Sequence, residues 1–203
     1  MKEKQIKILK DSQKIQKHPL GFFLRKNTKV LMLGSFPPKK QRWSMNFYYP
    51  NFQNDMWRIL GLIFFNDKNY FVDLSGKAFD EKKARNFCIK KAIGIGDSAV
   101  EIIRLKNNAS DNFLKVIKTA AIEKIIDSIP KCKTIILTGQ KAMDIFLSKV
   151  SIEEPLIGHF SEYKYKKRLL KVYRMPSTSR AYPKPLSEKA DIYKAMFEDI
   201  KLL

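Results

Sequence analysis

The sequence predicts an α/β fold: a three-layer sandwich in which a central, mainly parallel four-stranded sheet lies between helices. Three observations predict it. Short apolar runs bounded by Gly, Pro or polar turns alternate with longer segments of helical periodicity. Strands that are separated by helices pair in parallel, because the crossover returns the chain to the same end of the sheet. The 203 residues, 44% of them hydrophobic, suffice for one core, so we expect residues 1–203 to form a single domain.

The expected strands are apolar along most of their length, as is typical of parallel strands buried on both faces. A basic segment, residues 1–28, leads into the first strand. The four strands are residues 29–33, 92–95, 134–137 and 170–175.

Four segments between and after these strands show helical spacing of apolar residues. Residues 55–63 and 140–150 each place an apolar stripe on one face. Residues 110–130 predict a helix that Ser110 caps and Pro130 ends, and Ser187 is the expected cap of the last helix. Residues 66–90 predict an irregular insertion with one short helix.

The composition favours an anionic partner. The net charge is +20 and the pI about 9.9, which is typical of proteins that bind nucleic acid. A lysine-rich composition with no ligand explains the same charge, and this alternative stays open. No apolar run approaches the ~20 residues of a membrane helix. No apolar signal segment opens the chain, and its two cysteines form no disulfide framework, so we expect a cytoplasmic, nucleoid-associated monomer without membrane contact.

Polar and turn residues follow all four expected strands. Ligands of parallel α/β sheets lie at the carboxyl ends of the strands, so these segments are the candidate site. The four segments are Gly34-Ser35-Phe36-Pro37-Pro38, Gly96-Asp97-Ser98, Thr138-Gly139-Gln140-Lys141 and Pro176-Ser177-Thr178-Ser179-Arg180.

The glycine patterns of dinucleotide and P-loop sites are absent from these strand ends, so a nucleotide cofactor is not expected. The two histidines, His18 and His159, lie in no cluster with metal-ligand spacing, so no metal is expected either. We interpret His18 as a packing or turn residue.

Several of these residues have two interpretations. The hydroxyls of residues 177–179 suit phosphate oxygens, with Arg180 and Tyr182 as a wedge into a base stack, or they belong to an ordinary capping loop. Lys141 binds an anion at a helix start or lies in a plain connection. Asp97 reads a base edge, orients water or caps the next helix. Asn54 positions water or caps the helix of residues 55–63.

Five segments together resemble the uracil-DNA glycosylase superfamily, most closely its mismatch-specific and hypoxanthine-type branches. They occur in the order of that superfamily, and the resemblance runs from about His18 to the last helix. In order, they are LMLGSFPP, YYPNFQNDMWRIL, GIGDSAVEIIR (in the place of the central base-reading strand), LTGQKA and MPSTSRAY.

Two positions depart from the superfamily pattern. Phe36 stands where many members carry the Asp or Asn that positions the attacking water. Met175 stands where the best-known branch has a His that stabilises the leaving base. In the hypoxanthine-type branch, which shares the G-S-F-P sequence, an Asn in the following loop is implicated, and here that residue is Asn54.

The resemblance implies a cofactor-free DNA glycosylase that hydrolyses the N-glycosidic bond of a flipped, deaminated base, uracil or hypoxanthine. The alternatives are an inactive nucleic-acid-binding protein of the same fold and an unrelated α/β protein that binds a small phosphorylated ligand. Asn54 and Asp97 are the expected catalytic residues. The expected base-binding residues are Gly34, Ser35, Phe36, Tyr49 and Thr138. The expected DNA-binding residues are Lys39, Arg42, Gly139, Lys141, Pro176, Ser177, Thr178, Ser179, Arg180 and Tyr182.

Overall fold

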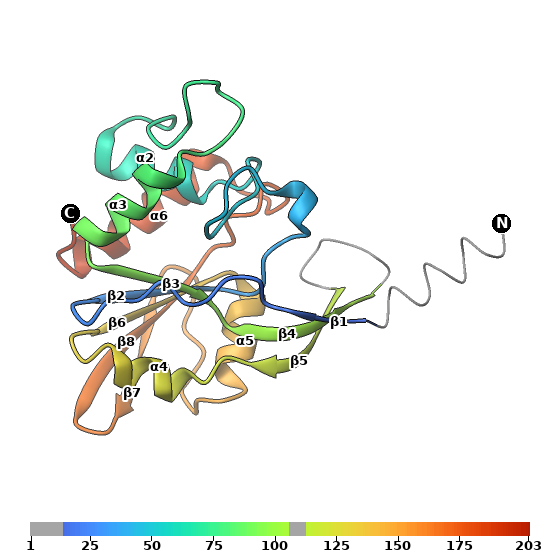
Figure 1. Ribbon diagram of the computed structural model, residues 1–203. Helices are drawn as coiled ribbons and strands as arrows, with labels where there is room; N and C mark the ends of the chain where they lie inside the picture. Colours follow the sequence, from blue (N-terminus) through green and yellow to red (C-terminus); the bar gives the residue numbers. More distant parts are fainter. Residues whose placement is uncertain (1–13, 106–112) are drawn as a thin grey trace, which may run out of the picture.

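The computed structural model describes residues 14–105 and 113–203 of the chain (Figure 1). In chain order, the elements are β1 (Ile15–Lys17), β2 (Val30–Gly34), the 3-10 helix η1 (Lys40–Arg42), α2 (Met56–Phe65), α3 (Glu81–Lys90), β3 (Ile93–Asp97), β4 (Ala99–Arg104), β5 (Leu114–Thr119), α4 (Ile122–Ser128), β6 (Thr134–Thr138), α5 (Gln140–Leu147), β7 (Phe160–Tyr165), β8 (Arg168–Met175) and α6 (Leu186–Asp199).

The main sheet has the strand order β3-β2-β6-β8-β7. Its first four strands are the four that the sequence predicts, and they pair in parallel. The expectation of a four-stranded sheet needs one correction, because β7 adds a fifth strand that pairs antiparallel to β8. Strand β7 alternates exposed and less exposed residues, as an edge strand does, so it has no apolar run to mark it in the sequence.

Two helical layers cover this sheet, which confirms the expected sandwich (Figure 1). The residues of β2 alternate between the layers, as the two-residue period of a strand requires. Val30 and Met32 pack in a core with residues of α2, α3 and α6. Leu31 and Leu33 pack in a second core with residues of α4 and α5. A strand that is apolar on both faces is therefore buried on both faces.

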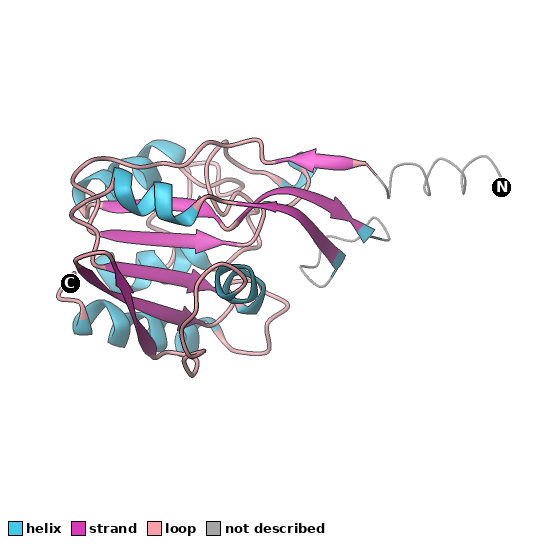
Figure 2. Cartoon of the chain, turned by 90° about the horizontal axis from the view of Figure 1, so that it is seen from below, coloured by secondary structure: helices cyan, strands magenta, loops and turns pink. Residues whose placement is uncertain are grey.

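A second, antiparallel sheet of order β1-β4-β5 lies beside the first (Figure 2). The prediction of one helix over residues 110–130 is wrong, because residues 114–119 form strand β5 of this sheet and helix α4 covers only Ile122–Ser128. The β-branched Val116 and Ile117 favour the strand, which pairs with β4. The expected cap Ser110 lies outside the described residues. Within the described part of the basic lead-in, Ile15–Lys17 form strand β1.

The base-reading strand expected at the centre is β3, which lies at the edge of the main sheet. Phe23 closes that edge through two backbone hydrogen bonds with Ile95, of 2.9 and 3.0 Å. The chain then turns at Ser98 directly into β4, so the next element is a strand and Asp97 caps no helix. Asp97 thus stands at the corner where the two sheets meet.

The helix starts differ slightly from expectation. Asp55 is the N-cap residue of α2, while the side chain of Asn54 accepts a hydrogen bond from the Met56 N–H at 2.9 Å. Helix α6 begins at Leu186 after Pro185, so Ser187 lies inside the first turn and is not the cap. Proline suits this place because its fixed φ is pre-organised for the chain's entry into a helix.

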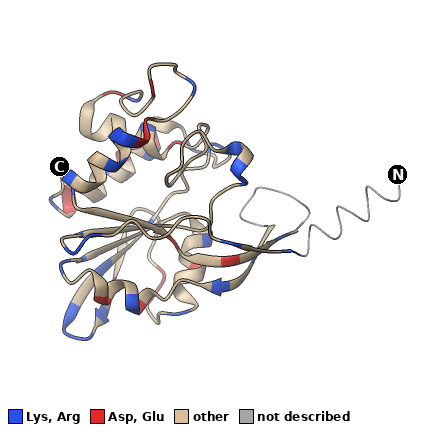
Figure 3. Cartoon of the chain, in the orientation of Figure 1, with Lys and Arg blue, Asp and Glu red and all other residues tan. Residues whose placement is uncertain are grey.

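Basic residues are distributed over many elements and are not confined to one face (Figure 3). Net charge therefore does not locate a ligand by itself. In residues 14–105 and 113–203, no helix is long and apolar enough to cross a bilayer.

Candidate active site

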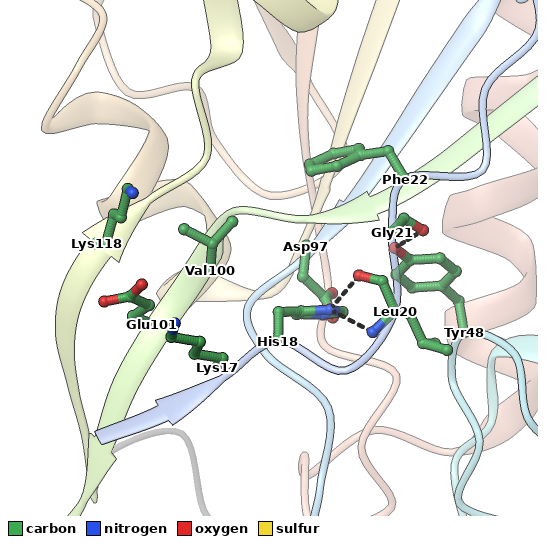
Figure 4. A pocket seen from close by; sticks show the side chains of 10 residues that line it. All are labelled: Lys17, His18, Leu20, Gly21, Phe22, Tyr48, Asp97, Val100, Glu101 and Lys118. Atoms are coloured by element: carbon green, nitrogen blue, oxygen red, sulfur yellow. Dashed lines mark hydrogen bonds and ion pairs between the residues drawn. The ribbon is translucent and has the colours of Figure 1, made fainter. Parts of the chain in front are cut away.

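A cavity of about 310 Å³ lies where β3 ends and the two sheets separate. Its walls come from the segment after β1, from β4 and β5, and from the aromatic loop that follows β2 (Figure 4). Asp97 lines it at the carboxyl end of β3, the position that ligands of parallel sheets favour. The volume is at the lower end of the ~300–1,000 Å³ range of small-molecule sites.

His18 holds the Asp97 carboxylate in this cavity. Its Nε2 lies 2.7 Å from Asp97 Oδ2, and both side chains are buried. A carboxylate only accepts hydrogen bonds, so Nε2 carries the hydrogen and donates. His18 Nδ1 lies 2.7 Å from the Leu20 carbonyl oxygen and 3.1 Å from the Leu20 amide nitrogen, so the backbone fixes the ring in either protonation state (Figure 4).

Two glycines make room for this arrangement. A Cβ on Gly34 would lie 2.3 Å from Asp97 Oδ1, so the carboxylate occupies the space that any side chain at residue 34 would need. A Cβ on Gly96 would lie 2.0 Å from a ring carbon of Phe22, another residue of the cavity wall. The glycines of the first two strand ends therefore serve close packing around Asp97.

Tyr49 connects β2 to β6. Its hydroxyl lies 3.0 Å from Thr138 Oγ1, and Thr138 donates in turn to the Leu33 carbonyl at 3.2 Å. Tyr49 has a φ of 51°, a conformation that a bulky residue rarely adopts and that costs about 1–3 kcal/mol. Strands β2 and β6 are neighbours followed by helices on opposite faces of the sheet, and such switch points are where α/β proteins bind ligands.

Both tyrosine hydroxyls of this region stay protonated. Burial, and next the Asp97 carboxylate, raise the pKa of Tyr48 and of Tyr49 well above the usual range. Tyr48 donates to the Gly21 carbonyl at 2.9 Å and lines the cavity. The wall beside Asp97 is therefore an uncharged aromatic surface.

Phe36, in the first segment that resembles the glycosylases, and Phe47, directly before the second, are buried in the protein. The Phe36 ring packs edge-on against His18 with 5.1 Å between centroids, so it supports the residue that holds Asp97. Ser35, the remaining predicted base-binding residue, is buried beside it, and its carbonyl accepts from the Ala99 N–H at 3.1 Å.

The loop Pro176–Arg180, which follows β8, is anchored by its carbonyl groups. Tyr193 donates to the Pro176 carbonyl, the Asp55 N–H to that of Thr178, and Lys189 to that of Ser179, at 2.9–3.0 Å. The Ser177 hydroxyl accepts from the Ser179 N–H at 3.2 Å, and the Ser179 hydroxyl from the Ala181 N–H at 3.3 Å. The loop is thus a rigid turn, with Ser179 and Arg180 exposed and Tyr182 half-buried after it.

The other predicted DNA-binding residues lie at neighbouring strand ends. Gly139 is the N-cap of α5, and its φ of 101° favours glycine. A Cβ there would lie 3.3 Å from Ser177 Cβ, so the ends of β6 and β8 meet closely. Lys141 lies half-buried in the first turn of α5, while Lys39 precedes η1 and Arg42 ends it.

In the part of the chain that the structure describes, no hydrogen bond joins the two predicted catalytic residues. Asp97 lines the cavity, whereas Asn54 is absent from its walls and uses its side-chain oxygen at the start of α2. Sequence reasoning missed His18, because 79 residues separate it from Asp97. The sequence holds one hint of this role: His18 precedes Pro19 in the segment before the first strand.

The described ranges contain no group of three or more metal-ligating side chains. Cys88 and Cys132 are buried as free thiols, and burial raises the pKa of Cys132 to about 11. Thiolate chemistry at Cys132 is therefore disfavoured at neutral pH.

No protein-family model matches the sequence, and no curated protein matches it. Among solved structures, the chain is similar to the solution NMR structure of "a putative Uracil DNA glycosylase from Methanosarcina acetivorans". The TM-score is 0.60 at 21% sequence identity, over 93% of this chain and 99% of that one. At this identity the likeness shows the fold, and the fold is the one that the sequence resemblance predicted. Membership of the superfamily, and the branch within it, stay predictions.

Proposed function

We propose that this protein is a monofunctional DNA glycosylase that removes a deaminated base, uracil or hypoxanthine, after the base has left the duplex. The observation that carries the proposal is the buried Asp97 carboxylate, which His18 holds at 2.7 Å in a cavity at the carboxyl end of β3. The shared fold supports it. The chain supplies this chemistry from its own side chains, and the proposal includes no cofactor.

In the proposed reaction, the C1′–N bond breaks and its electron pair leaves with the base. The sugar becomes oxocarbenium-like, and the oxygen of a water molecule then bonds to C1′ while a proton passes to the base. Asp97 stabilises the positive charge that develops on the sugar, and orients water. Fixed charge of this kind is effective in a water-excluded site because it needs no reorganisation during the reaction.

His18 positions Asp97, and Phe36 supports His18 from its edge. Tyr48 stacks on the His18 ring with 6.0 Å between centroids and closes the cavity wall beside it. Asn54 remains a second candidate for positioning water. Its amide Nδ2 makes no hydrogen bond within the described residues, while its oxygen accepts from Met56.

We propose that the DNA strand is contacted by the exposed residues of the 177–182 loop and by the cations Lys39, Arg42 and Lys141. We assign the wedge into the base stack to Tyr182, which is half-buried and follows this exposed turn.

The test is a base-release assay on duplexes and single strands with one uracil, hypoxanthine or xanthine, read as cleavable abasic sites. We expect release of at least one of these bases, with no release from undamaged strands. Binding without release of any base would favour an inactive nucleic-acid-binding protein. Absence of binding at low salt would favour a protein for a small phosphorylated ligand.

A further inference from the structure

A second cleft, of about 540 Å³, lies between α2, the turn after it and the segment that leads into α6. It shares no lining residue with the Asp97 cavity. Five of its nine lining residues are Lys or Arg, and Asp55 is the one acidic residue among them. The cleft is therefore strongly cationic.

The acidic residue of the cleft is already occupied. Asp55 Oδ2 accepts a hydrogen bond from Lys189 Nζ at 2.9 Å, and both side chains are buried. Lys184 pairs with Glu188 on the first turn of α6 at 3.0 Å. These pairs neutralise two of the five cations and leave three.

The remaining cations, Arg58, Lys68 and Arg180, come from three separate segments. In residues 14–105 and 113–203, none of them forms an ion pair with a carboxylate. Arg58 is held in place, because its Nη1 donates to the Phe52 carbonyl at 2.6 Å and its guanidinium lies 4.5 Å from the Phe52 ring centroid. Lys68 and Arg180 are exposed at the rim.

Two of these cations act on each other. Burial, and next the positive charge of Arg180, lower the pKa of Arg58 below its usual range. The Asp55 carboxylate, which already pairs with Lys189, offsets this repulsion only in part, and a bound anion would offset more of it. Pro185 and Leu186 also line the cleft, and α6 starts there without a side-chain cap. The first turn of this 14-residue helix therefore adds N–H donors at its positive end.

We propose that this cleft binds a backbone phosphate of the DNA strand, between Arg58, Lys68 and Arg180. The proposal deepens the proposed function, since it rests on DNA being the substrate. Guanidinium groups suit phosphate because their planar fork matches two oxygens. Arg180 ends the loop that follows β8. A DNA strand bound in this cleft would therefore run along that loop toward the carboxyl edge of the sheet.

The test variant is Lys68→Gln, because Lys68 is exposed and its removal leaves the fold intact. Lys131→Gln is the matched control: it removes the same charge from an exposed lysine before β6, at the opposite end of the sheet. Binding of an undamaged duplex is measured by fluorescence anisotropy over a salt series. We expect Lys68→Gln to reduce the log–log salt slope by about 0.9 and to weaken binding about fivefold near 0.15 M salt. Lys131→Gln should match the parent.

A slope for Lys68→Gln equal to that of Lys131→Gln overturns the proposal, whether or not the protein releases bases. A reduced slope in a protein that releases no base supports the cleft and rejects the glycosylase. A third arm compares inorganic phosphate with sodium chloride at equal ionic strength. Thermal stabilisation by phosphate that Lys68→Gln abolishes, with the DNA slope unchanged, would identify a free-phosphate site and overturn the assignment to a DNA strand.

Discussion

The Asp97 cavity lies at the end of β3, the Arg58–Arg180 cleft lies beside α2 and the segment into α6, and the two are built differently. In the cavity, the charged group is buried, has a fixed partner in His18 and lies against the Cα of Gly34. In the cleft, the ion pair of Asp55 and Lys189 is buried, while Lys68 and Arg180 are exposed and form no ion pair within residues 14–105 and 113–203.

The difference shows which kind of ligand group each region suits. A buried, oriented carboxylate fits a reacting centre, because its position decides how well it stabilises a developing charge. Exposed cations fit a phosphate, which binds through charge and tolerates variation in position. Changes to the cavity should therefore affect reaction more than binding, and changes to the rim of the cleft should affect binding more than reaction.

The largest expected effect comes from the buried ion pair of the cleft. Lys189→Met leaves Asp55 as a buried carboxylate without its partner, which costs about 3–5 kcal/mol of unfolding free energy. It also removes the donor to the Ser179 carbonyl, so the loop after β8 loosens. Chemical denaturation measures the loss.

Lys194→Met is the control for this substitution, because Lys194 lies on the same helix in an exposed pair 3.9 Å from Glu198. Such a surface pair contributes about 0–1 kcal/mol. Adding Asp55→Asn to Lys189→Met should recover part of the loss. Equal, small losses for the two lysine variants would show that the buried pair does not hold the loop.

The next effect is on reaction. Asp97→Asn keeps the shape of the side chain but removes its charge, so base release should fall at least ~100-fold, the scale of a lost catalytic group. Duplex binding should stay within about twofold of the parent, since no phosphate contact changes. Single-turnover release and anisotropy measure the two quantities. Release at the parent rate would show that Asp97 is structural.

The sequence was sufficient for the elements whose residues share one environment. Strands β2, β3 and β6 are buried at every residue, and β8 is buried at four of the six residues 170–175, so their apolar runs predicted them and their parallel pairing. Strands β1, β5 and β7 are partly exposed and mix lysines or glutamate with apolar residues. In residues 110–130 the spacing of apolar residues also matched a helix, and only pairing with β4 decides between the two.

The candidate site was predictable where it depends on strand ends and not where it depends on contacts across the fold. The sequence predicts that Asp97 belongs to the site, because Asp97 directly follows an apolar strand. It does not predict His18, because the role of His18 comes from one hydrogen bond to a residue 79 positions away. Arg58 and Lys68 belong to a helix and a turn that the sequence identified only as such, and their meeting with Arg180 requires the packing of α2 beside α6.

A smaller effect should follow from crowding Asp97 without changing it. Gly34→Ala places a methyl group 2.3 Å from Asp97 Oδ1, so the carboxylate must move or the strands must separate. Overpacking of this kind costs about 1–3 kcal/mol. Base release should fall more than binding does, since the displaced group is the reacting one. Gly94→Ala is the control, because it overpacks β3 against the Leu24 side chain at 2.8 Å without contact to Asp97; equal release by both variants would mean that the position of Asp97 is not critical.

The smallest effect concerns Asn54, for which the cap and the water-positioning role make different predictions. Asn54→Ala removes the oxygen that accepts from the Met56 N–H, so we expect a loss of about 1 kcal/mol in unfolding free energy. Asn54→Asp restores that oxygen and should restore the stability, but it lacks the Nδ2 donor. If Nδ2 holds the water, both variants should release base about tenfold more slowly, the equivalent of one lost hydrogen bond of about 1.4 kcal/mol. Parent-rate release by Asn54→Asp at parent stability would assign Asn54 to the cap alone and leave Asp97 as the catalytic group.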